Sequence, residues 1–385
     1  MMEDWQNGGF GLYLHWPFCA AKCPYCDFNS HVAQEIDESR WQRAFLSEIE
    51  RVGKLTERRL LNSVFFGGGT PSLMSPDLVH AILDKVRATW TLANDIEITL
   101  EANPTSIEAG RFRGYSEAGV NRVSMGMQAL NDRDLKALGR MHSVAEGRKA
   151  FDIARAQFDR VSFDLIYARQ DQDLGHWRRE LNEALSMAVD HFSLYQLTIE
   201  DGTAFGARHA AGKLRGLPSD DIAADMYLLT QEICDQAGLP AYEVSNHARS
   251  GCESRHNLVY WRYGDYAGIG PGAHGRLTIN GIRHATDTPK QPEAWLDQVE
   301  RTGAGEREFS ALPLEEQATE FLLFNLRLAE GLDPNRYESM SGKAFDPQSL
   351  RDLQNMEMIQ LEEGRIKATN AGRAILNAVI RELMP

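Results

Sequence analysis

The chain has 385 residues, of which 43% are hydrophobic and 25% are charged, and its net charge is −14. The acidic balance argues against a nucleic-acid partner, which requires many Lys and Arg side chains against phosphates. No stretch approaches the roughly 18 apolar residues of a membrane span, and the N-terminus has no basic region followed by an apolar run. Five cysteines do not suggest a disulfide framework. We therefore expect a cytoplasmic protein without a signal peptide.

The first half of the chain alternates strand-like runs with helical stretches. Trp41, Phe45 and Ile49 recur at helical spacing and predict a helix over Glu38–Lys54. Alternating strands and helices predict an α/β fold with a parallel sheet and right-handed crossovers. We expect a partial (β/α)6 barrel whose chemistry lies at the C-terminal ends of the strands. The six runs are Gly11–His15, Ser63–Phe66, Glu97–Glu101, Arg122–Met125, Val161–Tyr167 and Phe192–Leu197.

Three cysteines follow the first strand with the spacing C-x3-C-x2-C, and we call Cys19, Cys23 and Cys26 the Cys trio. Three thiolates this close together can all face one metal centre. A [4Fe–4S] cluster ordinarily has four Cys ligands, so a set of three would leave one iron open to a small molecule. The spacing alone also allows a zinc site that lacks a distant partner, or buried thiols without a ligand.

Further candidate residues follow other strands at the same end of the expected barrel. The glycines of Gly67–Pro71 either bring the backbone close to a ligand or make a flexible turn. Glu101 either accepts hydrogen bonds from ribose hydroxyls or is a solvated surface residue. Arg140 either holds a carboxylate with two hydrogen bonds or lies on a helix surface. Asp164 is the more informative acid, because it lies inside an apolar run.

The Cys trio with Tyr25 before its last member resembles the motif of the radical S-adenosylmethionine (SAM) superfamily. That resemblance implies a [4Fe–4S] cluster whose open iron binds the amino and carboxylate groups of SAM. An electron passed through the cluster then yields a 5′-deoxyadenosyl radical, while the protein positions the reactants.

The order of all these motifs is similar to the oxygen-independent coproporphyrinogen III oxidase (HemN) branch of that superfamily. By this resemblance Asp164 and Thr198 also lie where the oxidase holds a second SAM, and whether one binds here stays open. The residues implied to contact SAM are Tyr13, Tyr25, Gly68, Gly69, Thr70, Glu101, Gln128, Arg140 and Asp164.

Two departures separate the chain from the oxidase. Phe28 stands where the oxidase has a fourth Cys, two residues past the third, and the first strand begins near residue 10 without the oxidase's N-terminal extension. The missing extension argues against decarboxylation of a tetrapyrrole.

The motif His-Asn-x-x-Tyr-Trp over residues 256–261 resembles the signature of the haem chaperone (HemW) family. This resemblance implies haem binding by His256, since a neutral imidazole is a good axial ligand, with Tyr260 and Trp261 packed on the macrocycle. The residues alone also allow a hydrogen-bonded histidine in an aromatic corner. His247 and Cys252 are weaker ligand candidates.

The remaining segments suggest how the chain is divided. The Gly-rich stretch Gly268–Gly275 suggests close backbone approach to a ligand or to the sheet, and Ala285–Glu306 predicts a linker around one helix, Glu293–Arg301. The C-terminal pattern predicts a small winged-helix-like domain with a docking or lid role, because no basic recognition helix stands out. Its expected elements are Glu316–Leu328, Asp346–Met356, Gly364–Thr369 and Ala371–Leu383. We expect a barrel over 1–205, an α+β segment over 206–300 and the small helical domain over 310–385.

Together the resemblances imply a haem chaperone that binds haem, a [4Fe–4S] cluster and SAM, and that transfers haem to acceptor apoproteins. The alternative is an oxygen-independent coproporphyrinogen III oxidase or another radical SAM tetrapyrrole enzyme, such as one that cleaves haem reductively. Whether SAM is cleaved stays open, so no enzymatic activity is assigned. Transient membrane-associated partners and a homodimer are also compatible with the sequence, whereas a nucleic acid is not expected.

Overall fold

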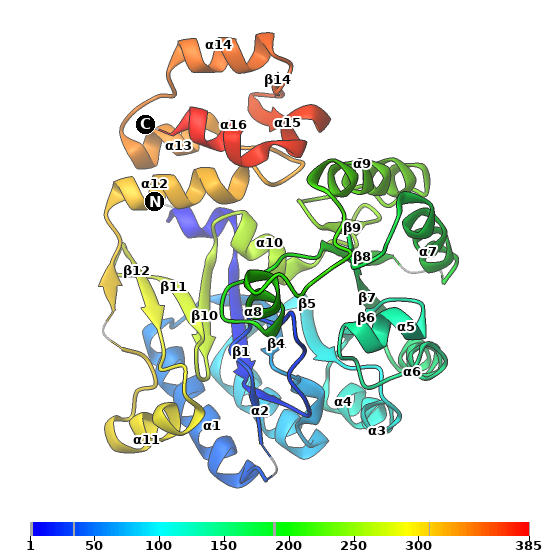
Figure 1. Cartoon of the computed structure of the whole chain (residues 1–385). Coiled ribbons are helices and arrows are strands. Elements are labelled where there is room, and N and C mark those ends of the chain that lie inside the picture. The colour runs from blue at the N-terminus through cyan, green and yellow to red at the C-terminus, as the bar shows by residue number, and fades with distance from the viewer. Residues whose placement is uncertain (1–2, 34, 188–189, 308, 385) are drawn as a thin grey trace.

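The computed structural model describes residues 3–33, 35–187, 190–307 and 309–384, and one large sheet organises it (Figure 1). The strands of this sheet are β1 (Phe10–Trp16), β4 (Leu60–Gly68), β5 (Thr91–Ala102), β6 (Arg122–Gln128), β7 (Arg160–Tyr167), β8 (His191–Gln196), β9 (Asn246–Ala248), β10 (Asp265–Ile269), β11 (His274–Ile279), β12 (Ile282–Asp287) and β13 (Ser310–Ala311). Their order is β13-β12-β11-β10-β1-β4-β5-β6-β7-β8-β9.

The strands β10, β1 and β4 to β8 run parallel to one another, and antiparallel strands lie at both edges. The six strands predicted for the partial barrel are therefore confirmed as β1 and β4 to β8. Strand β10 adds a seventh parallel strand beside β1, with Phe10 opposite Asp265. The segment after residue 205 thus continues the barrel sheet.

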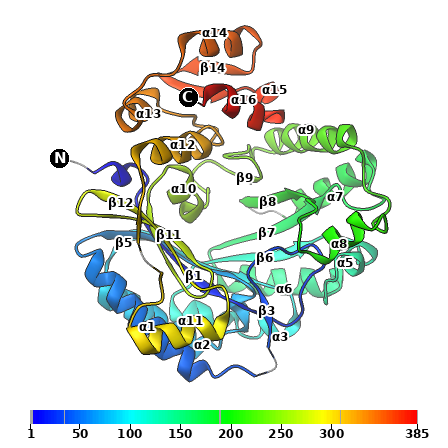
Figure 2. The same cartoon turned by 60° about the vertical axis from the view of Figure 1, so that its left-hand side comes forward.

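Helices cover the outer face of the sheet, as Figure 2 shows for α1 and α2. The helices up to the end of the sheet are α1 (Glu38–Leu55), α2 (Pro76–Thr89), α3 (Ser106–Ala109), α4 (Phe112–Ala118), α5 (Asp132–Ala137), α6 (Val144–Gln157), α7 (Leu174–Ser186), α8 (Ala204–Ala210), α9 (Asp220–Gln236), α10 (Arg255–Trp261) and α11 (Pro292–Thr302). No helix among the described residues is long and apolar enough to cross a membrane.

Alternation along β1 separates the hydrophobic core from the interior of the barrel, because successive side chains of a strand point to opposite faces. On the outer face, Trp16 packs against Trp41 of α1 with ring centroids 5.6 Å apart. On the inner face, Tyr13 stacks on Phe65 and on His256 of α10. The outer side chains of β1, all buried, are Phe10, Leu12, Leu14 and Trp16.

The predicted linker Ala285–Glu306 is wrong at its start. Residues 285–287 complete β12, which pairs with β11 as an antiparallel hairpin. Asn280 and Gly281 form the turn, and both have positive φ angles (51° and 77°). Asn-Gly is the preferred pair for a two-residue hairpin turn of this kind. The helix expected in the linker is present as α11.

The C-terminal elements form a small unit with a separate hydrophobic cluster that includes Phe321, Leu322 and Val379. In Figures 1 and 2 it lies above α10 and the N-terminus. The predicted helix Ala371–Leu383 is interrupted at Ile375, where φ is −123°. The elements are α12 (Leu314–Asn325), α13 (Pro334–Ser341), α14 (Pro347–Asn355), β14 (Ile359–Glu362), β15 (Arg365–Ala368), α15 (Asn370–Ala374) and α16 (Leu376–Leu383).

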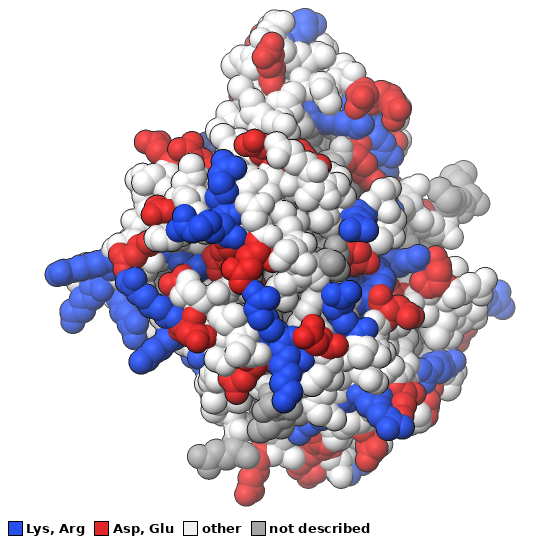
Figure 3. Space-filling model, turned by 90° about the vertical axis from the view of Figure 1, so that its right-hand side faces the viewer, with Lys and Arg blue, Asp and Glu red and all other residues white. Residues whose placement is uncertain are grey.

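The surface carries both signs of charge. On the face shown in Figure 3, Lys and Arg side chains are interspersed with Asp and Glu.

Candidate functional site

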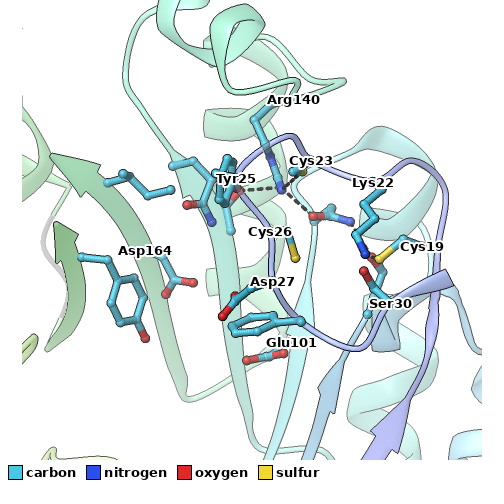
Figure 4. Close-up of a pocket in the computed structure, with 18 of the residues that line it drawn as sticks. Cys19, Lys22, Cys23, Tyr25, Cys26, Asp27, Ser30, Glu101, Arg140 and Asp164 are labelled. Carbon is cyan, nitrogen blue, oxygen red and sulfur yellow. Dashed lines mark hydrogen bonds between the residues drawn. The ribbon is translucent and has the colours of Figure 1, made fainter. Parts of the chain in front are cut away.

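The C-terminal ends of the parallel strands surround a cavity of about 440 Å³, which we call the Cys-loop cavity (Figure 4). The loop after β1 enters it and is closed by two short strands, β2 (Phe18–Cys19) and β3 (His31–Val32), which pair with each other. All but one of the residues predicted to contact SAM line this cavity, and Thr198 lies there as well. The predicted SAM contacts in its lining are Tyr25, Gly68, Gly69, Thr70, Glu101, Gln128, Arg140 and Asp164. The Cys trio lines the cavity as well.

The Cys trio consists of free, partly exposed thiols. Figure 4 shows Cys19 and Cys26 facing the cavity, while Cys23 lies beside Arg140. Across the described part of the chain, no three His, Cys, Asp or Glu side chains converge as the ligands of one metal ion would. A [4Fe–4S] cluster fits this arrangement, since its thiolates bind different irons and the cavity lies directly beside them.

A chain of hydrogen bonds links two members of the Cys trio across the cavity wall. Thr70 Oγ1 donates to Cys19 Sγ at 3.3 Å and accepts from Asn103 Nδ2 at 3.1 Å. Arg140 Nη2 donates to Asn103 Oδ1 at 2.6 Å, and its Nη1 lies 3.5 Å from Cys23 Sγ. Hydrogen bonds to sulfur are one means by which a protein sets the potential of a bound cluster.

Sequence reasoning missed Asn103, the middle residue of this series of hydrogen bonds. It lies two positions after Glu101, just past the end of β5, and both residues line the cavity. That spacing was the available signal, but the role of Asn103 depends on Thr70 and Arg140, which come from other elements.

Two glycines at the end of β4 allow this strand to approach the Cys loop. Gly68 has a φ of 110°, and a Cβ there would lie 2.7 Å from the imidazole of His15. A Cβ on Gly69 would lie 2.6 Å from the carbonyl oxygen of Phe18, and the Gly69 amide donates to the Trp16 carbonyl at 2.7 Å. Close backbone packing therefore requires glycine at both positions.

Two carboxyl groups face the cavity, one from β5 and one from β7. Burial, reinforced by the charge of Asp164, raises the pKa of Glu101 to about 8. Burial raises the pKa of Asp164 to about 6, although hydrogen bonding to Ser193 and the charges of Arg122 and Arg140 oppose this shift. Perturbed carboxyl groups of this kind are common in functional sites. Binding of a cationic sulfonium would favour their ionised forms.

Gln128 reaches the cavity through an irregularity in β6. The register of β6 against β7 shifts between Met125 and Gln128, and Gln128 has a φ of 68°. A positive φ is uncommon for a residue other than glycine and is typical of strained functional positions. The bulge directs this side chain into the cavity instead of continuing the ladder.

Tyr13, the remaining predicted SAM contact, lines a second cavity of about 600 Å³, which we call the aromatic cavity. Phe28, Gly68, Glu101 and Tyr195 line both cavities, so the two adjoin. Within the described ranges, no Lys or Arg lines the aromatic cavity. Its aromatic rings belong to Tyr13, Phe28, Tyr195, Tyr260, Trp261, Tyr266 and Phe324, and its other side chains include His15, Asn29, Glu101, Glu243, Asn257 and His274.

His256 does not face either cavity. Its imidazole is 1% exposed, its Nδ1 lies 2.8 Å from Ser63 Oγ and its Nε2 lies 2.6 Å from Tyr260 Oη. Coordination of iron by His256 would require Tyr260 to release Nε2 and the ring to leave its site. The predicted ligand role thus disagrees with this geometry, while the hydrogen-bonded alternative agrees with it. His247 on β9 and Cys252 before α10 line neither cavity.

Asn29 fixes the end of the Cys loop to the distant second half of the chain. Its Nδ2 donates to the carbonyl oxygens of Pro271 (2.9 Å) and Lys290 (2.8 Å). Its own carbonyl oxygen lies 2.9 Å from His15 Nε2, and His15 Nδ1 lies 3.1 Å from Tyr13 Oη. Both ring nitrogens of His15 are therefore engaged.

Comparison with known proteins yields consistent similarities. Residues 13–180 match the Radical SAM superfamily and residues 312–375 match the HemN C-terminal domain. The chain is 37% identical to radical S-adenosyl methionine domain-containing protein 1, mitochondrial, of Bos taurus, over 97% of this chain and 87% of that protein. It is 37% identical to the heme chaperone HemW of Escherichia coli, over 87% of each. The solved structure of coproporphyrinogen III oxidase (HemN) from Escherichia coli has the same fold, with a TM-score of 0.82 and 21% identity over 98% of this chain and 92% of that one.

Proposed function

The chain belongs to the radical SAM superfamily, as a HemN-like member close to HemW, and on this premise we propose that it is a haem chaperone. It binds haem, a [4Fe–4S] cluster and SAM, and it passes haem to acceptor apoproteins. The Cys trio holds the cluster, and the residues of the Cys-loop cavity hold SAM. Haem is the cargo of this protein.

The observation that carries the proposal is the composition of the aromatic cavity. Tyr260, Trp261 and Asn257 of the chaperone-like motif line it, and aromatic side chains offer a flat macrocycle large contact areas. Its volume of about 600 Å³ lies within the range of small-molecule and cofactor sites. The described lining has no Lys or Arg to pair with propionates. This favours haem, which has two propionates, over coproporphyrinogen, which has four.

The residues around the Cys-loop cavity suit the binding and orientation of SAM. When bound, the cluster supplies the electron for SAM cleavage. Gly68 and Gly69 have no side chains to block the ligand, Glu101 offers carboxylate oxygens to ribose hydroxyls, and Arg140, which lies beside Cys23, would pair with the carboxylate of SAM. Tyr13 reaches this site only from the adjoining cavity, so its contact with SAM is the weakest of the set.

An anaerobic haem titration of the cluster-loaded protein, followed by Soret absorbance, tests the proposal. We expect saturable binding of one haem, and transfer to apomyoglobin when that acceptor is added. Trp261→Ala should lower the affinity, because it removes part of the cavity wall, whereas Tyr227→Ala on α9 is a matched control outside the cavity. Binding no stronger than to an unrelated acidic protein would overturn the proposal.

A radical SAM tetrapyrrole enzyme is the second candidate, and the intact set of predicted SAM contacts around the Cys-loop cavity favours it. Anaerobic incubation with coproporphyrinogen III, SAM and a reductant separates the two functions. A product with new vinyl groups would replace the chaperone proposal with an oxidase. Loss of the haem Soret band only when SAM and reductant are both present would indicate reductive haem cleavage.

The location and partners follow from the proposal. We place the chain in the cytoplasm, while noting that the Bos taurus relative is named mitochondrial. Its partners would be haem-accepting apoproteins, some of them bound to membranes, and a second copy of the chain is a further option.

A further inference from the structure

The aromatic cavity contains one histidine whose imidazole is unengaged. Both ring nitrogens of His15 are hydrogen bonded, to Tyr13 and to the Asn29 backbone. His256 lies behind Tyr260, with both nitrogens occupied. His274 lines the cavity, and in the part of the chain that the structure describes its side chain makes no hydrogen bond or ion pair. A good axial ligand needs a nitrogen lone pair that the protein does not already use.

The backbone of His274 is held firmly although its side chain is unengaged. It begins β11, opposite Asp287 of β12. The glycine-rich loop before it is fixed by Thr288, whose Oγ1 donates to Gly270 O at 2.6 Å and whose amide donates to Ala273 O at 3.1 Å. A side chain on a rigid backbone loses less freedom when it binds a ligand.

The protonation state also suits coordination. Partial burial lowers the pKa of His274 below its ordinary value. The charge of Asp287 raises this pKa, while the charges of Arg276, Lys290 and Arg307 lower it further. The neutral imidazole, which is the form that binds iron, therefore prevails at neutral pH.

The wall of the cavity restricts how haem enters. Glu101 and the buried Glu243 line it, and among the described residues no Lys or Arg does. Ionised propionates would lose hydration there without a cationic side chain in the lining, which is unfavourable. The propionate edge should therefore face solvent while the apolar edge lies among the aromatic rings.

Building on the proposed function, we infer that His274 is the axial ligand of haem held in the aromatic cavity with its propionates toward solvent. His256 then acts indirectly, by holding Tyr260 in the cavity wall. The two histidines have different roles, and spectroscopy can separate them.

The test is an anaerobic ferric-haem titration of full-length, cluster-loaded protein, read by Soret position and electron paramagnetic resonance. His274→Ala should change the iron spectrum and weaken binding tenfold or more, and added imidazole should restore the wild-type spectrum. His274→Met should give a different spectrum, because a thioether replaces the imidazole. His256→Gln and the surface variant His176→Ala should keep the wild-type spectrum.

The outcomes distinguish this inference from the function on which it rests. If wild-type protein binds haem and His274→Ala gives the same spectrum and affinity, the inference is overturned while the chaperone proposal stands. If His256→Gln alone loses the spectrum, His256 is the ligand. If wild-type protein binds no haem, both fall.

Discussion

Replacing His256 by Ala tests whether this histidine is a structural residue. The imidazole is 1% exposed, and its stacking on Phe65 brings the ring centroids to 5.0 Å. Removing it leaves Ser63 Oγ and Tyr260 Oη without the partners they have in the native protein. It also leaves a space in the packed interior of the barrel.

The cost can be worked from these contacts. Each buried hydroxyl left unpaired costs about 1–3 kcal/mol, and truncation of a large buried side chain to Ala costs about 2–5 kcal/mol in all. Since the terms overlap, we expect the free energy of unfolding to fall by about 3–5 kcal/mol. Proteins are stable by about 5–15 kcal/mol, so this loss is a large fraction of the total stability.

Urea unfolding of the metal-free protein, followed by tryptophan fluorescence, measures this loss. His256→Gln should lose less, because its amide can still bond one of the two hydroxyls. His176→Ala, whose side chain is 57% exposed, should change stability by less than about 0.5 kcal/mol. If His256→Ala unfolds at the wild-type urea concentration, the reasoning is refuted and a ligand role for His256 becomes the better explanation.

Three further predictions concern the cluster, the sheet and pH. Replacing any member of the Cys trio by Ala should remove most bound iron and sulfide, measured by chemical assay, whereas Cys252→Ala should not; retention of about four irons per chain would contradict the ligand assignment. Asp265→Asn should cost about 3–5 kcal/mol in urea unfolding, because two buried arginines lose their partner, and the half-exposed Asp287→Asn is the control. The raised pKa of Glu101, about 8 against an ordinary 4.5, means that the folded metal-free protein holds a proton which the unfolded chain releases. Stability should therefore fall as pH rises between these values, by at most about 1.4 kcal/mol per pH unit, and an unchanged slope in Glu101→Gln would exclude this cause.

Much of the barrel could be predicted because its signals are local. The six strands alternate with amphipathic helices, and their polar residues stand at the strand ends. Parallel strands bring those ends to one edge, which is why residues from β4, β5, β6 and β7 meet the Cys loop in one cavity.

The rest depended on contacts between distant residues. Strand β10 contains the buried Asp265, and Asp is disfavoured in strands. Its ion pairs with Arg59 (2.6 Å) and Arg283 (2.9 Å) explain why Asp265 is tolerated there. The engagement of His256 by Ser63, 193 positions away, likewise leaves no trace in the motif itself. The Asn280–Gly281 turn is different, since its signal was local and was overlooked.

The pairing of β1 with β10 has a consequence for the making of the protein. At about 5–20 residues per second of synthesis, β10 leaves the ribosome roughly 10–50 seconds after β1. During that interval one edge of β1 has no neighbour, which is a hazard for aggregation. Asn29 also lacks the carbonyl groups of Pro271 and Lys290 that fix the end of the Cys loop. Iron and sulfide are therefore expected to enter after translation, and nascent chains that stop before residue 265 should not retain them.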